Sequence, residues 1–570
     1  MKRQTRAERI VDALKLANVP CVFGLPGSQM LELFEALRRS QLRTITTTSE
    51  LAAAFMAGGW ARITGDPGVI VTMAGPGFMW ALNGIAEARL DSVPLVHISG
   101  VVGASPAGRR FRQQDLAQRD IAAPLVKQVI DAAAYSDPGV AVLEALRVAR
   151  SGEPGPVLLQ VSQPMLAGDL RESGVDLSVA PPQDSAGLNA VCARVQGARR
   201  PVFIVGDGAS PHSRMVREVV ERLKCPLLTT PSARGLLPED HPLNFGFDPF
   251  GENVSEINEL IDSCDAVFAI GCKLSHSGTF GFELRLPAAR LVQLDASPEI
   301  VGANYSPSLA VVAGAGDLFQ ALVALPLAHS DWTVEELAQW RVLLKARPAV
   351  GREPRIAGTP AGEPAAFFKA LRRALPPEAI LVLDSGLHQM LARRYFQVES
   401  PQGLLMPTDL QSMGFAIPTA IGARLAAPNR PVVALVGDGG FAMTALDLLT
   451  AAREGISLTV IVFVDGAFGQ IRMQQLSDYG ASHGVLLQNP DFRLLAGAVG
   501  AHYELAGEDD IAAIVRRALM ATGVTVVEVA VGDTLEILRR AVVARLREGT
   551  RRLAGPGLFQ RIRKWVKRSA

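Results

Sequence analysis

The chain has 570 residues, too many for one hydrophobic core, so its length predicts three or four domains. Hydrophobic residues make up 48% of the sequence and charged residues 20%, a composition typical of soluble globular proteins. The 57 basic and 56 acidic side chains leave a formal charge of +1, without the basic excess usual in nucleic-acid-binding proteins. Five scattered cysteines without a CxxC pair indicate reduced core thiols, and we expect a cytoplasmic protein.

The N-terminal segment is charged from its first residues and lacks the apolar stretch of a signal peptide. Its apolar side chains recur at helical spacing and predict a first helix; they are Ile10, Val11, Leu14 and Leu16. No run of about 18 apolar residues occurs further along, so the sequence predicts no transmembrane helix.

Short β-branched runs that end in glycine-rich turns, each followed by a helical segment, dominate the chain. They occur at 68–77, 201–210, 265–274 and 431–440. Apolar strands alternating with helices are typical of parallel sheets covered on both faces. The sequence therefore predicts the α/β class, with three doubly wound parallel-sheet domains.

Two proline-containing stretches without strands, at about 166–188 and 326–363, interrupt this alternation and are expected to be linkers. They divide the chain into three predicted domains and a tail. The predicted bounds are 1–167, 188–325 and 363–533 for the domains and 534–570 for the tail.

Two aspartates stand at predicted strand ends. Asp438 lies in a Gly-Asp-Gly turn after one apolar strand, and Asp465 precedes a glycine after the next. Ligands of parallel sheets bind at the carboxyl ends of strands, where glycines let a phosphate approach and helix N-termini offer free N–H groups. A diphosphate would call for a divalent cation such as Mg²⁺, which prefers oxygen ligands. The alternative is that each aspartate caps a turn.

The segment GDGGFAMTALDLLTAAREGISLTVIVFVDGAFGQIRMQQ resembles the thiamine-diphosphate motif. The resemblance implies Mg²⁺ bound by Asp438, Asp465 and the backbone carbonyl of Ala467. Most members of that superfamily have asparagine where this chain has Asp465. The catabolic acetolactate synthases also have aspartate there, and its charge should strengthen metal binding.

Further motifs extend the resemblance over nearly the whole chain, including FGLPGS, TTTSELAAAFMAGGWAR, VTMAGPG, LDSGLHQMLARRYF, QSMGFAIPTAIGA and NPDFRLLAGAVGA. They are similar to acetolactate-synthase-like enzymes, whose three domains are the pyrimidine-binding, central and diphosphate-binding domains. In that family each active site forms between the first domain of one subunit and the third of another. The resemblance therefore implies a homodimer or homotetramer.

The same resemblance assigns roles to individual residues. Glu50 would contact N1′ of the cofactor's aminopyrimidine, and Met413 would hold the cofactor in its bent conformation. The other expected cofactor-binding residues are Gly386, His388, Gln389, Gly437, Asp438, Gly439, Gly440 and Gly469. Residue type and spacing alone leave Glu50 open as a first-turn acidic residue beside the helix dipole, and Met413 as a core methionine.

The substrate pocket is less clearly marked. Counting back from Lys127, the family's catalytic glutamine corresponds to Gln114, and a nearby basic run could hold a carboxylate or form a solvated loop. That run consists of Arg109, Arg110 and Arg112. Trp80 replaces a residue that is usually small and polar, and Gln474 replaces the tryptophan typical of anabolic acetolactate synthases.

The expected function is decarboxylation of a 2-oxo acid, with pyruvate favoured, and carboligation to an acceptor carbonyl. One alternative is a benzoylformate-decarboxylase-like or benzaldehyde-lyase-like enzyme. Another is a catalytically weak cofactor-binding protein recruited to a membrane or partner. FAD remains open in the central domain, but the stretch 273–277 lacks the family's flavin-binding Arg-Phe-Asp-Asp-Arg pattern and disfavours it.

The C-terminal segment GLFQRIRKWVKRSA combines basic and apolar residues at helical spacing. A short basic amphipathic helix with tryptophan is typical of peripheral contact with an anionic membrane, here the inner membrane surface. The alternative is a helix that docks on the protein itself or on a partner subunit.

Overall fold

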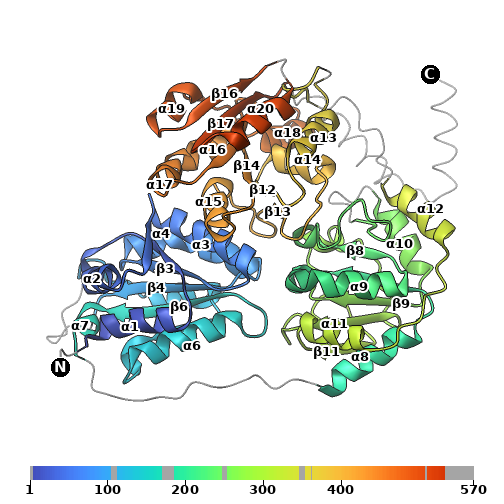
Figure 1. The fold of residues 1–570 in the computed structure, drawn as a ribbon, viewed down its shortest axis with the longest axis horizontal. Coiled ribbons are helices and arrows are strands. Elements are labelled where there is room, and N and C mark those ends of the chain that lie inside the picture. The colour runs from blue at the N-terminus through green and yellow to red at the C-terminus, as the bar shows by residue number, and fades with distance from the viewer. Residues whose placement is uncertain are drawn as a thin grey trace.

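The computed structural model describes residues 4–103, 112–169, 185–246, 253–345, 354–360, 362–507 and 510–532. Three sheets follow one another along the chain, and helices flank each of them (Figure 1). Every pairing between the named strands is parallel. The predicted α/β class with three doubly wound parallel-sheet domains is confirmed. We refer to residues 4–169, 185–345 and 354–532 as the first, central and third units.

The first unit has a six-stranded sheet in the order β2-β1-β3-β4-β6-β5. Its strands are β1 (Cys21–Gly24), β2 (Arg43–Thr46), β3 (Gly68–Thr72), β4 (Leu95–Val101), β5 (Gln128–Asp131) and β6 (Pro156–Ser162). Its helices are α1 (Arg6–Leu16), α2 (Leu31–Ser40), α3 (Glu50–Thr64), α4 (Pro76–Leu90), α5 (Gln118–Ala122), α6 (Pro138–Arg150) and α7 (Gln163–Leu166). The predicted first helix is α1: Ile10, Val11 and Leu14 are buried, whereas Leu16 is exposed.

The central unit has a five-stranded sheet in the order β11-β10-β9-β7-β8. Its strands are β7 (Pro201–Val205), β8 (Leu227–Thr229), β9 (Ala266–Ile270), β10 (Leu291–Asp295) and β11 (Leu309–Val312). Its helices are α8 (Ser185–Gly197), α9 (Ser213–Leu223), α10 (Val254–Asp262), α11 (Ala315–Ala324) and α12 (Val334–Lys345).

Helix α12 lies within the stretch that was expected to be a linker. Trp332, Leu337 and Leu344 are buried in the hydrophobic cluster of the central unit, and the Trp332 indole donates to Pro201 O at 3.0 Å. This part of the segment therefore packs on the central unit instead of connecting two units freely. Most of the other expected linker, residues 170–184, lies outside the described residues.

The third unit has a six-stranded sheet in the order β13-β12-β14-β15-β17-β16. Its strands are β12 (Ile380–Leu383), β13 (Leu404–Leu405), β14 (Val432–Gly437), β15 (Leu458–Val464), β16 (His502–Ala506) and β17 (Val524–Ala530). Its helices are α13 (Pro364–Ala374), α14 (Leu387–Tyr395), α15 (Ala416–Ala426), α16 (Asp438–Thr444), α17 (Leu448–Arg453), α18 (Gly469–Tyr479), α19 (Phe492–Ala498) and α20 (Ile511–Met520). No described helix has the length and apolar content needed to span a bilayer.

Each sheet has one point at which successive strands are added on opposite sides. These points lie between β1 and β3, between β7 and β9, and between β12 and β14. In open parallel sheets such a point leaves a crevice beyond the carboxyl ends of the strands, and ligands bind there. The fold thus provides three candidate binding crevices, one in each unit.

The first and third units pack tightly through α3 and α15, which lie side by side in Figure 1. A Cβ atom added to Gly59 would come within 2.2 Å of Thr419 O, and one added to Gly422 within 1.9 Å of Met56 O. Phe55 and Phe415 meet edge to face at the same interface, with ring centroids 5.5 Å apart. Glycine is required at both positions because any side chain would force the two helix backbones apart.

We expect Gly422→Ala to destabilise the protein by about 1–3 kcal/mol, because the added methyl group overpacks the interface. Thermal denaturation monitored by circular dichroism would measure the shift in Tm. Gly58→Ala is the matched control: Gly58 also lies in α3, but no atom stands within 4 Å of the added Cβ. Equal Tm values for the Gly422 variant and the wild type would contradict this account of the interface.

Candidate active site

Asp438 lies in the crevice between β12 and β14, at the first position of α16. Its side chain is buried, and it accepts hydrogen bonds from Gly439 N at 2.9 Å and Gly466 N at 2.8 Å. The Asn489 amide also donates to it, at 2.8 Å. These contacts fix the direction of the carboxylate at the end of the sheet.

Asp465 follows the neighbouring strand β15 and accepts a hydrogen bond from Ala467 N at 3.2 Å. A Cβ atom added to Gly469 would come within 2.1 Å of the Asp465 Oδ2, so glycine makes room for this carboxylate. Burial, and then the charge of Asp438, raises the pKa of Asp465 to about 6. The two strand-end carboxylates, together with the carbonyl of Ala467, form an oxygen donor set that fits a hard divalent cation.

Larger metal-binding clusters are absent from the described ranges: no group of three or more His, Cys, Asp or Glu side chains is placed to hold a metal. Two carboxylates and one backbone carbonyl are too few to complete an octahedron. A cation there would need further oxygen ligands from a bound diphosphate or water, as magnesium commonly does.

His388 lies over the Gly-Asp-Gly turn. Its ring stands 3.1 Å from a Cβ atom added to Gly437 and 3.0 Å from one added to Gly386, whose φ is +145°. Burial lowers the pKa of His388 to about 3, so the imidazole is neutral, and its buried Nε2 has no hydrogen-bond partner among the described residues. A buried polar nitrogen without a partner beside a glycine turn fits a phosphate oxygen from a bound ligand.

The remaining glycines of the turn are closely surrounded. A Cβ atom added to Gly439 would lie 2.7 Å from the Phe468 ring, and one added to Gly440 would lie 3.1 Å from Asp384 Oδ1. Gln389, expected at the cofactor, donates its amide to Pro407 O at 3.0 Å. Its observed contact is therefore with the protein backbone.

Met413 lies in a turn that a buried carboxylate holds in place. Asp384, at the end of β12, accepts hydrogen bonds from Ser385 N, Gly414 N and Ala416 N, each at 2.9 Å. Burial raises the pKa of Asp384 to about 7 despite these three donors. The bonds from Gly414 N and Ala416 N tie the residues just after Met413 to the strand end, while the Met413 side chain itself is half-buried.

Sequence reasoning did not single out Asp384 or Asn489. Signals for both were present, because Asp384 is a strand-end carboxylate in LDSGLHQM and Asn489 opens the NPDF motif. Their partners lie 30 and 51 positions away, respectively, at Gly414 and Asp438. Spacing along the chain does not reveal such contacts.

Glu50 is the first residue of α3 in the first unit, after the N-cap Ser49, whose side chain accepts from Ala52 N at 3.1 Å. A Cβ atom added to Gly77 would lie 2.8 Å from Glu50 Oε1, so the carboxylate rests against the glycine turn that follows β3. Glu50 therefore both starts helix α3 and places its carboxylate in the crevice of the first unit. The two observations are compatible, and the catalytic role of Glu50 stays a prediction.

Gln114 packs against the same turn. A Cβ atom added to Gly75 would lie 2.9 Å from the Gln114 Cβ, and Gln114 has a φ of +63°. The Gln29 amide donates to the Gln114 Oε1. The buried Gln118 accepts from Gly75 N at 3.0 Å and donates to Gly100 O at 3.0 Å, which fastens this part of the chain to the strand ends.

Other residues named from the sequence have different surroundings. Trp80 is 63% exposed on α4, and Gln474 is exposed on α18. Arg112 pairs with Asp115 at 2.7 Å, whereas Arg109 and Arg110 lie outside the described residues.

Among the described residues of one chain, no direct polar contact links the two halves of the predicted site. The first and third units touch near the site through a hydrogen bond from Thr48 Oγ1 to Asp447. No hydrogen bond or ion pair among the described residues joins Glu50 to His388, Asp438 or Asp465.

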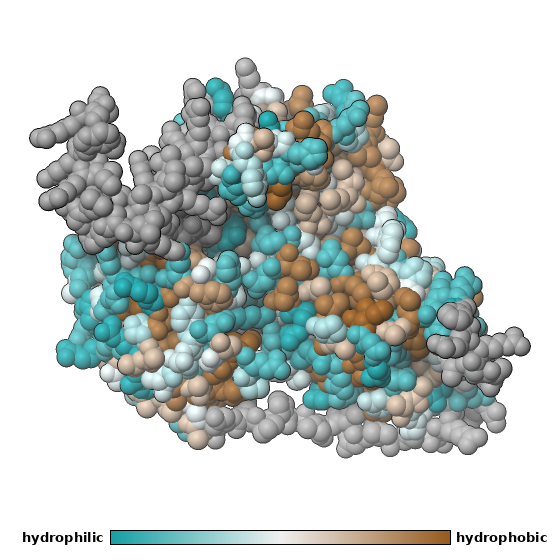
Figure 2. Space-filling model, turned by 180° about the vertical axis from the view of Figure 1, so that it is seen from behind, coloured by the Kyte–Doolittle hydropathy of each residue, from teal (hydrophilic) through white to brown (hydrophobic). Residues whose placement is uncertain are grey.

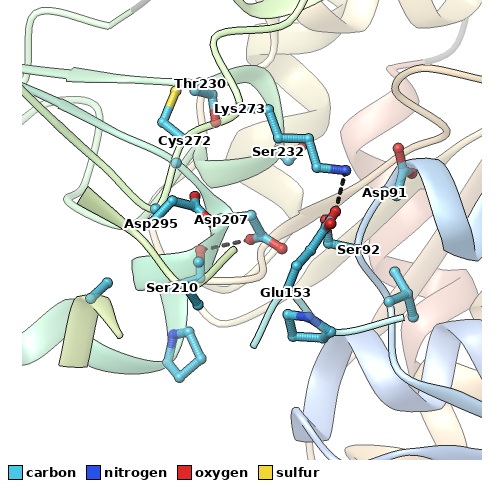
Figure 3. Close-up of a pocket in the computed structure, with 18 of the residues that line it drawn as sticks. Asp91, Ser92, Glu153, Asp207, Ser210, Thr230, Ser232, Cys272, Lys273 and Asp295 are labelled. Atoms are coloured by element: carbon cyan, nitrogen blue, oxygen red, sulfur yellow. Dashed lines mark hydrogen bonds and ion pairs between the residues drawn. The ribbon is translucent and has the colours of Figure 1, made fainter. Parts of the chain in front are cut away.

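A separate cleft of about 480 Å³ lies between the first and central units, at the β7–β9 crevice (Figure 3). Ser210 donates to Asp207 at 2.7 Å, and Lys273 pairs with Glu153 at 2.9 Å across the two units. Asp207 lines the cleft and is exposed there. Burial raises the pKa of Asp295 to about 6.

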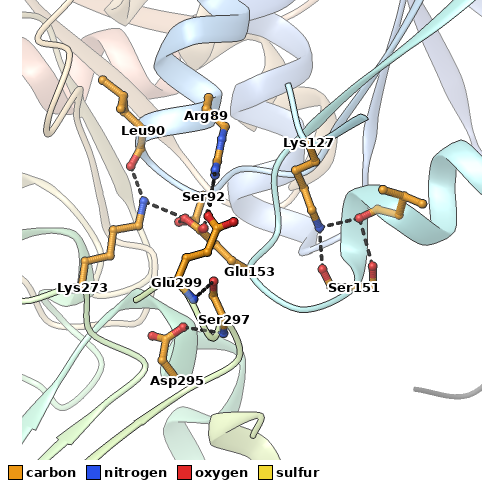
Figure 4. Close-up of polar contacts among 11 residues, drawn as sticks. Arg89, Leu90, Ser92, Lys127, Ser151, Glu153, Lys273, Asp295, Ser297 and Glu299 are labelled. Atoms are coloured by element: carbon orange, nitrogen blue, oxygen red, sulfur yellow. Dashed lines mark hydrogen bonds and ion pairs between the residues drawn. The ribbon is translucent and has the colours of Figure 1, made fainter. Parts of the chain in front are cut away.

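Glu153 links the two sides of this cleft (Figure 4). Besides Lys273, it pairs with Arg89 at 3.2 Å and accepts from Ser92 Oγ at 2.7 Å. Arg62, the other cation of the cleft, pairs with Asp91 at 2.7 Å. Among the described residues, Arg62 and Lys273 of the cleft therefore each already have a carboxylate partner.

Family models match all three units of the chain. The N-terminal thiamine pyrophosphate binding domain matches residues 4–122, the central domain of thiamine pyrophosphate enzymes matches 188–322, and the C-terminal thiamine pyrophosphate binding domain matches 384–529. The chain belongs to the thiamine pyrophosphate enzyme family. Both crevices described above, in the first and third units, lie in the cofactor-binding domains of this enzyme family.

Curated relatives agree with this assignment. The enzyme is 32% identical to the acetolactate synthase large subunit of Corynebacterium glutamicum, over 88% of this chain and 82% of that protein. It is also 32% identical to a probable 2-ketoarginine decarboxylase of Pseudomonas aeruginosa, over 92% and 94%, respectively. Acetolactate synthase isozyme 1 of Escherichia coli is 29% identical over 83% and 84%. The predicted resemblance to acetolactate-synthase-like enzymes, and the carboligase or lyase class, are confirmed.

Proposed function

We propose that the enzyme decarboxylates a 2-oxo acid, with pyruvate as the favoured donor, and joins the remaining two-carbon unit to an acceptor carbonyl. The observation that carries this proposal is the pair of crevices. One holds Glu50 and Gln114, and the other holds His388 over the turn of Asp438. The chemistry that thiamine diphosphate supplies when bound is a nucleophilic carbon and an electron sink for the electrons left by CO₂.

The chain's own residues would bind and orient the two ends of the cofactor. Glu50 would hold a proton at the aminopyrimidine N1′, and the Met413 turn would fix the angle between the rings. His388 and the glycine turn would receive the diphosphate, while Gln114 would contact the substrate. Such positioning can lower a barrier by about 7–11 kcal/mol when the reacting atoms are aligned.

The test is CO₂ release and product analysis with a panel of 2-oxo acids, with and without aldehyde acceptors. Ligated products from pyruvate would support the proposal. The aromatic alternative would give turnover only with benzoylformate or benzaldehyde-type substrates. Cofactor binding without turnover would instead support the weak cofactor-binding alternative, which the relatives do not favour.

Mg²⁺ is the cation that we propose for Asp438, Asp465 and the Ala467 carbonyl, because all three donors are hard oxygens. The Asn489 amide would act through Asp438 as a positioning group. We expect Asn489→Leu to weaken Mg²⁺-dependent cofactor binding by about 10- to 100-fold, as outer-shell changes commonly do. Titrating thiamine diphosphate at several Mg²⁺ concentrations, followed by tryptophan fluorescence, would measure this. Unchanged Mg²⁺ dependence would contradict a positioning role for Asn489.

We propose that the active site is completed by a second copy of the chain. The first and third units expose large apolar side chains on α4, α16, the turn after it and α17, which a partner could cover. These are Met79, Trp80, Met443, Leu446 and Leu449. In the space-filling view, apolar side chains gather on the half of the molecule formed by these two units (Figure 2).

Complementation tests this arrangement directly. Glu50→Gln and Asp438→Asn variants would be mixed under dissociating conditions and reassembled. If Glu50 and Asp438 of one site come from different chains, mixed dimers contain one intact site, and about half of the wild-type activity per mixed dimer returns. A mixture that stays inactive despite exchange of subunits would contradict the proposal.

The central cleft disfavours FAD. Asp207 stands at the glycine turn that a diphosphate would approach, and Arg62 and Lys273 are already paired with carboxylates. A flavin dinucleotide would add negative charge there, and the described lining residues offer no Lys or Arg without a carboxylate partner to balance it. Flavin absorbance of the purified protein, before and after incubation with FAD, would test this, and stoichiometric flavin would overturn it.

The C-terminal tail, 534–570, lies outside the described residues, and its role remains a proposal from sequence. We propose that its basic and apolar composition allows contact with an anionic membrane surface in an otherwise cytoplasmic enzyme. Co-sedimentation with anionic liposomes would compare the full chain with one ending at residue 555. Equal sedimentation of both would contradict membrane contact through the tail.

A further inference from the structure

Gln29 occupies the binding crevice of the first unit, between β1 and β3. It lies in the short helical turn Ser28–Met30, just beyond the end of β1. The neighbouring Gly27 packs against Met73, and Met73 packs against Gly77 beside Glu50. Gln29 therefore stands at the strand ends where the sheet is expected to receive its ligand.

The Gln29 side chain contacts the predicted catalytic glutamine directly. Its Nε2 donates to the Gln114 Oε1, across 85 positions of sequence. The Gln114 backbone has a φ of +63° and packs against Gly75, which holds Gln114 in place beside Gln29. The two glutamines therefore form a defined polar pair in the crevice.

One atom of this pair has no partner among the described residues. The Gln29 Oε1 is buried and accepts no hydrogen bond from the part of the chain that the structure describes. Buried amide oxygens are nearly always hydrogen-bonded, so a donor from outside the chain is expected there. A water molecule can supply it between turnovers, and a substrate hydroxyl or N–H group can replace that water.

Pyruvate cannot supply this donor, because its only substituent beyond the 2-oxo acid group is a methyl. The second substrate, the acceptor carbonyl compound, can. We propose that Gln29 is a specificity-determining residue that selects acceptors with a hydroxyl or N–H group next to the reacting carbonyl. This inference rests on the proposed carboligation.

Competition between two acceptors of nearly equal size tests the inference. The enzyme, with thiamine diphosphate, Mg²⁺ and pyruvate, receives equal concentrations of glycolaldehyde and propanal, which differ by a hydroxyl in place of a methyl. The ratio of the two ligated products depends on specificity and not on the amount of active enzyme. We expect the wild type to favour glycolaldehyde by about three- to tenfold, the range of one net hydrogen bond.

Gln29→Leu should bring this product ratio to about one or below, because leucine offers no acceptor. Gln128→Leu, a matched change at an exposed glutamine of β5, should leave the ratio at its wild-type value. A ratio unchanged in Gln29→Leu, or equal loss of both products, would overturn the inference, and so would CO₂ release without ligation to either aldehyde. Failure of the wild type to release CO₂ from pyruvate would instead overturn the proposed function itself.

Discussion

Glu50→Gln should lower turnover by about 10²- to 10⁴-fold, the range that a positioned acid or base contributes. The substitution keeps the shape of the side chain beside Gly77 but removes its ionisable proton. Helix α3 retains its Ser49 cap, so the fold and cofactor affinity should change little. Steady-state rates of pyruvate consumption, together with Tm and thiamine diphosphate affinity, would measure these effects.

The alternative for Glu50 is a purely local role at the start of the helix. Loss of a favourable charge there would cost about 0.3–1 kcal/mol of stability and leave turnover near the wild-type value. Glu144→Gln provides the matched control, since Glu144 is a surface glutamate paired with Arg147 on α6. A Glu50 variant that behaves like this control would refute the catalytic assignment.

Asp438→Asn should weaken Mg²⁺-dependent cofactor binding by more than about 100-fold, since even outer-shell changes at metal sites cost about 10- to 100-fold. The carboxylate accepts from Gly439 N, Gly466 N and the Asn489 amide. An amide at this position would present N–H groups to some of these donors, besides losing the charge. Isothermal titration of thiamine diphosphate over a range of Mg²⁺ concentrations would measure the loss.

Asp465→Asn is the informative companion variant. Asparagine keeps an oxygen for the cation, and the family resemblance implies asparagine at this position in most members. We therefore expect cofactor affinity to fall by less than about tenfold. The substitution also removes the repulsion from Asp438 that raises the pKa of Asp465. Equal losses for the two variants would mean that the two aspartates do not play the unequal roles assigned here.

The alternation of apolar strands with helices was sufficient to predict three parallel sheets, because a strand buried on both faces needs a continuous apolar run. β14 and β15 are the two apolar strands that the sequence placed before Asp438 and Asp465. The segment around α12 was misjudged for the opposite reason. It contains no strand, so the alternation of strands and helices does not mark it, although Leu337, Trp340 and Leu344 stand at the i, i+3, i+7 spacing of one helix face.

Local sequence also marked the residues at strand ends, since glycine and aspartate are concentrated in those turns. It placed Asp438, Asp465 and His388 near one another, and the structure brings them to the same end of the third sheet. Local sequence gave no indication that the Gln389 amide would donate to Pro407 O. It also did not show that Asp384 would accept from the backbone next to Met413. Those outcomes depend on which backbone groups the fold leaves within hydrogen-bond reach.

By itself, the sequence determined the three α/β units, the strand-end position of Asp438 and Asp465 and the family to which the enzyme belongs. Only the tertiary structure decided that Gln29 contacts Gln114, that Asn489 orients Asp438, and that Gly422 lets α15 lie against α3. The physical reason is the same in each case. Strand and turn preferences act over a few neighbouring residues, whereas these contacts join positions that only chain packing brings together.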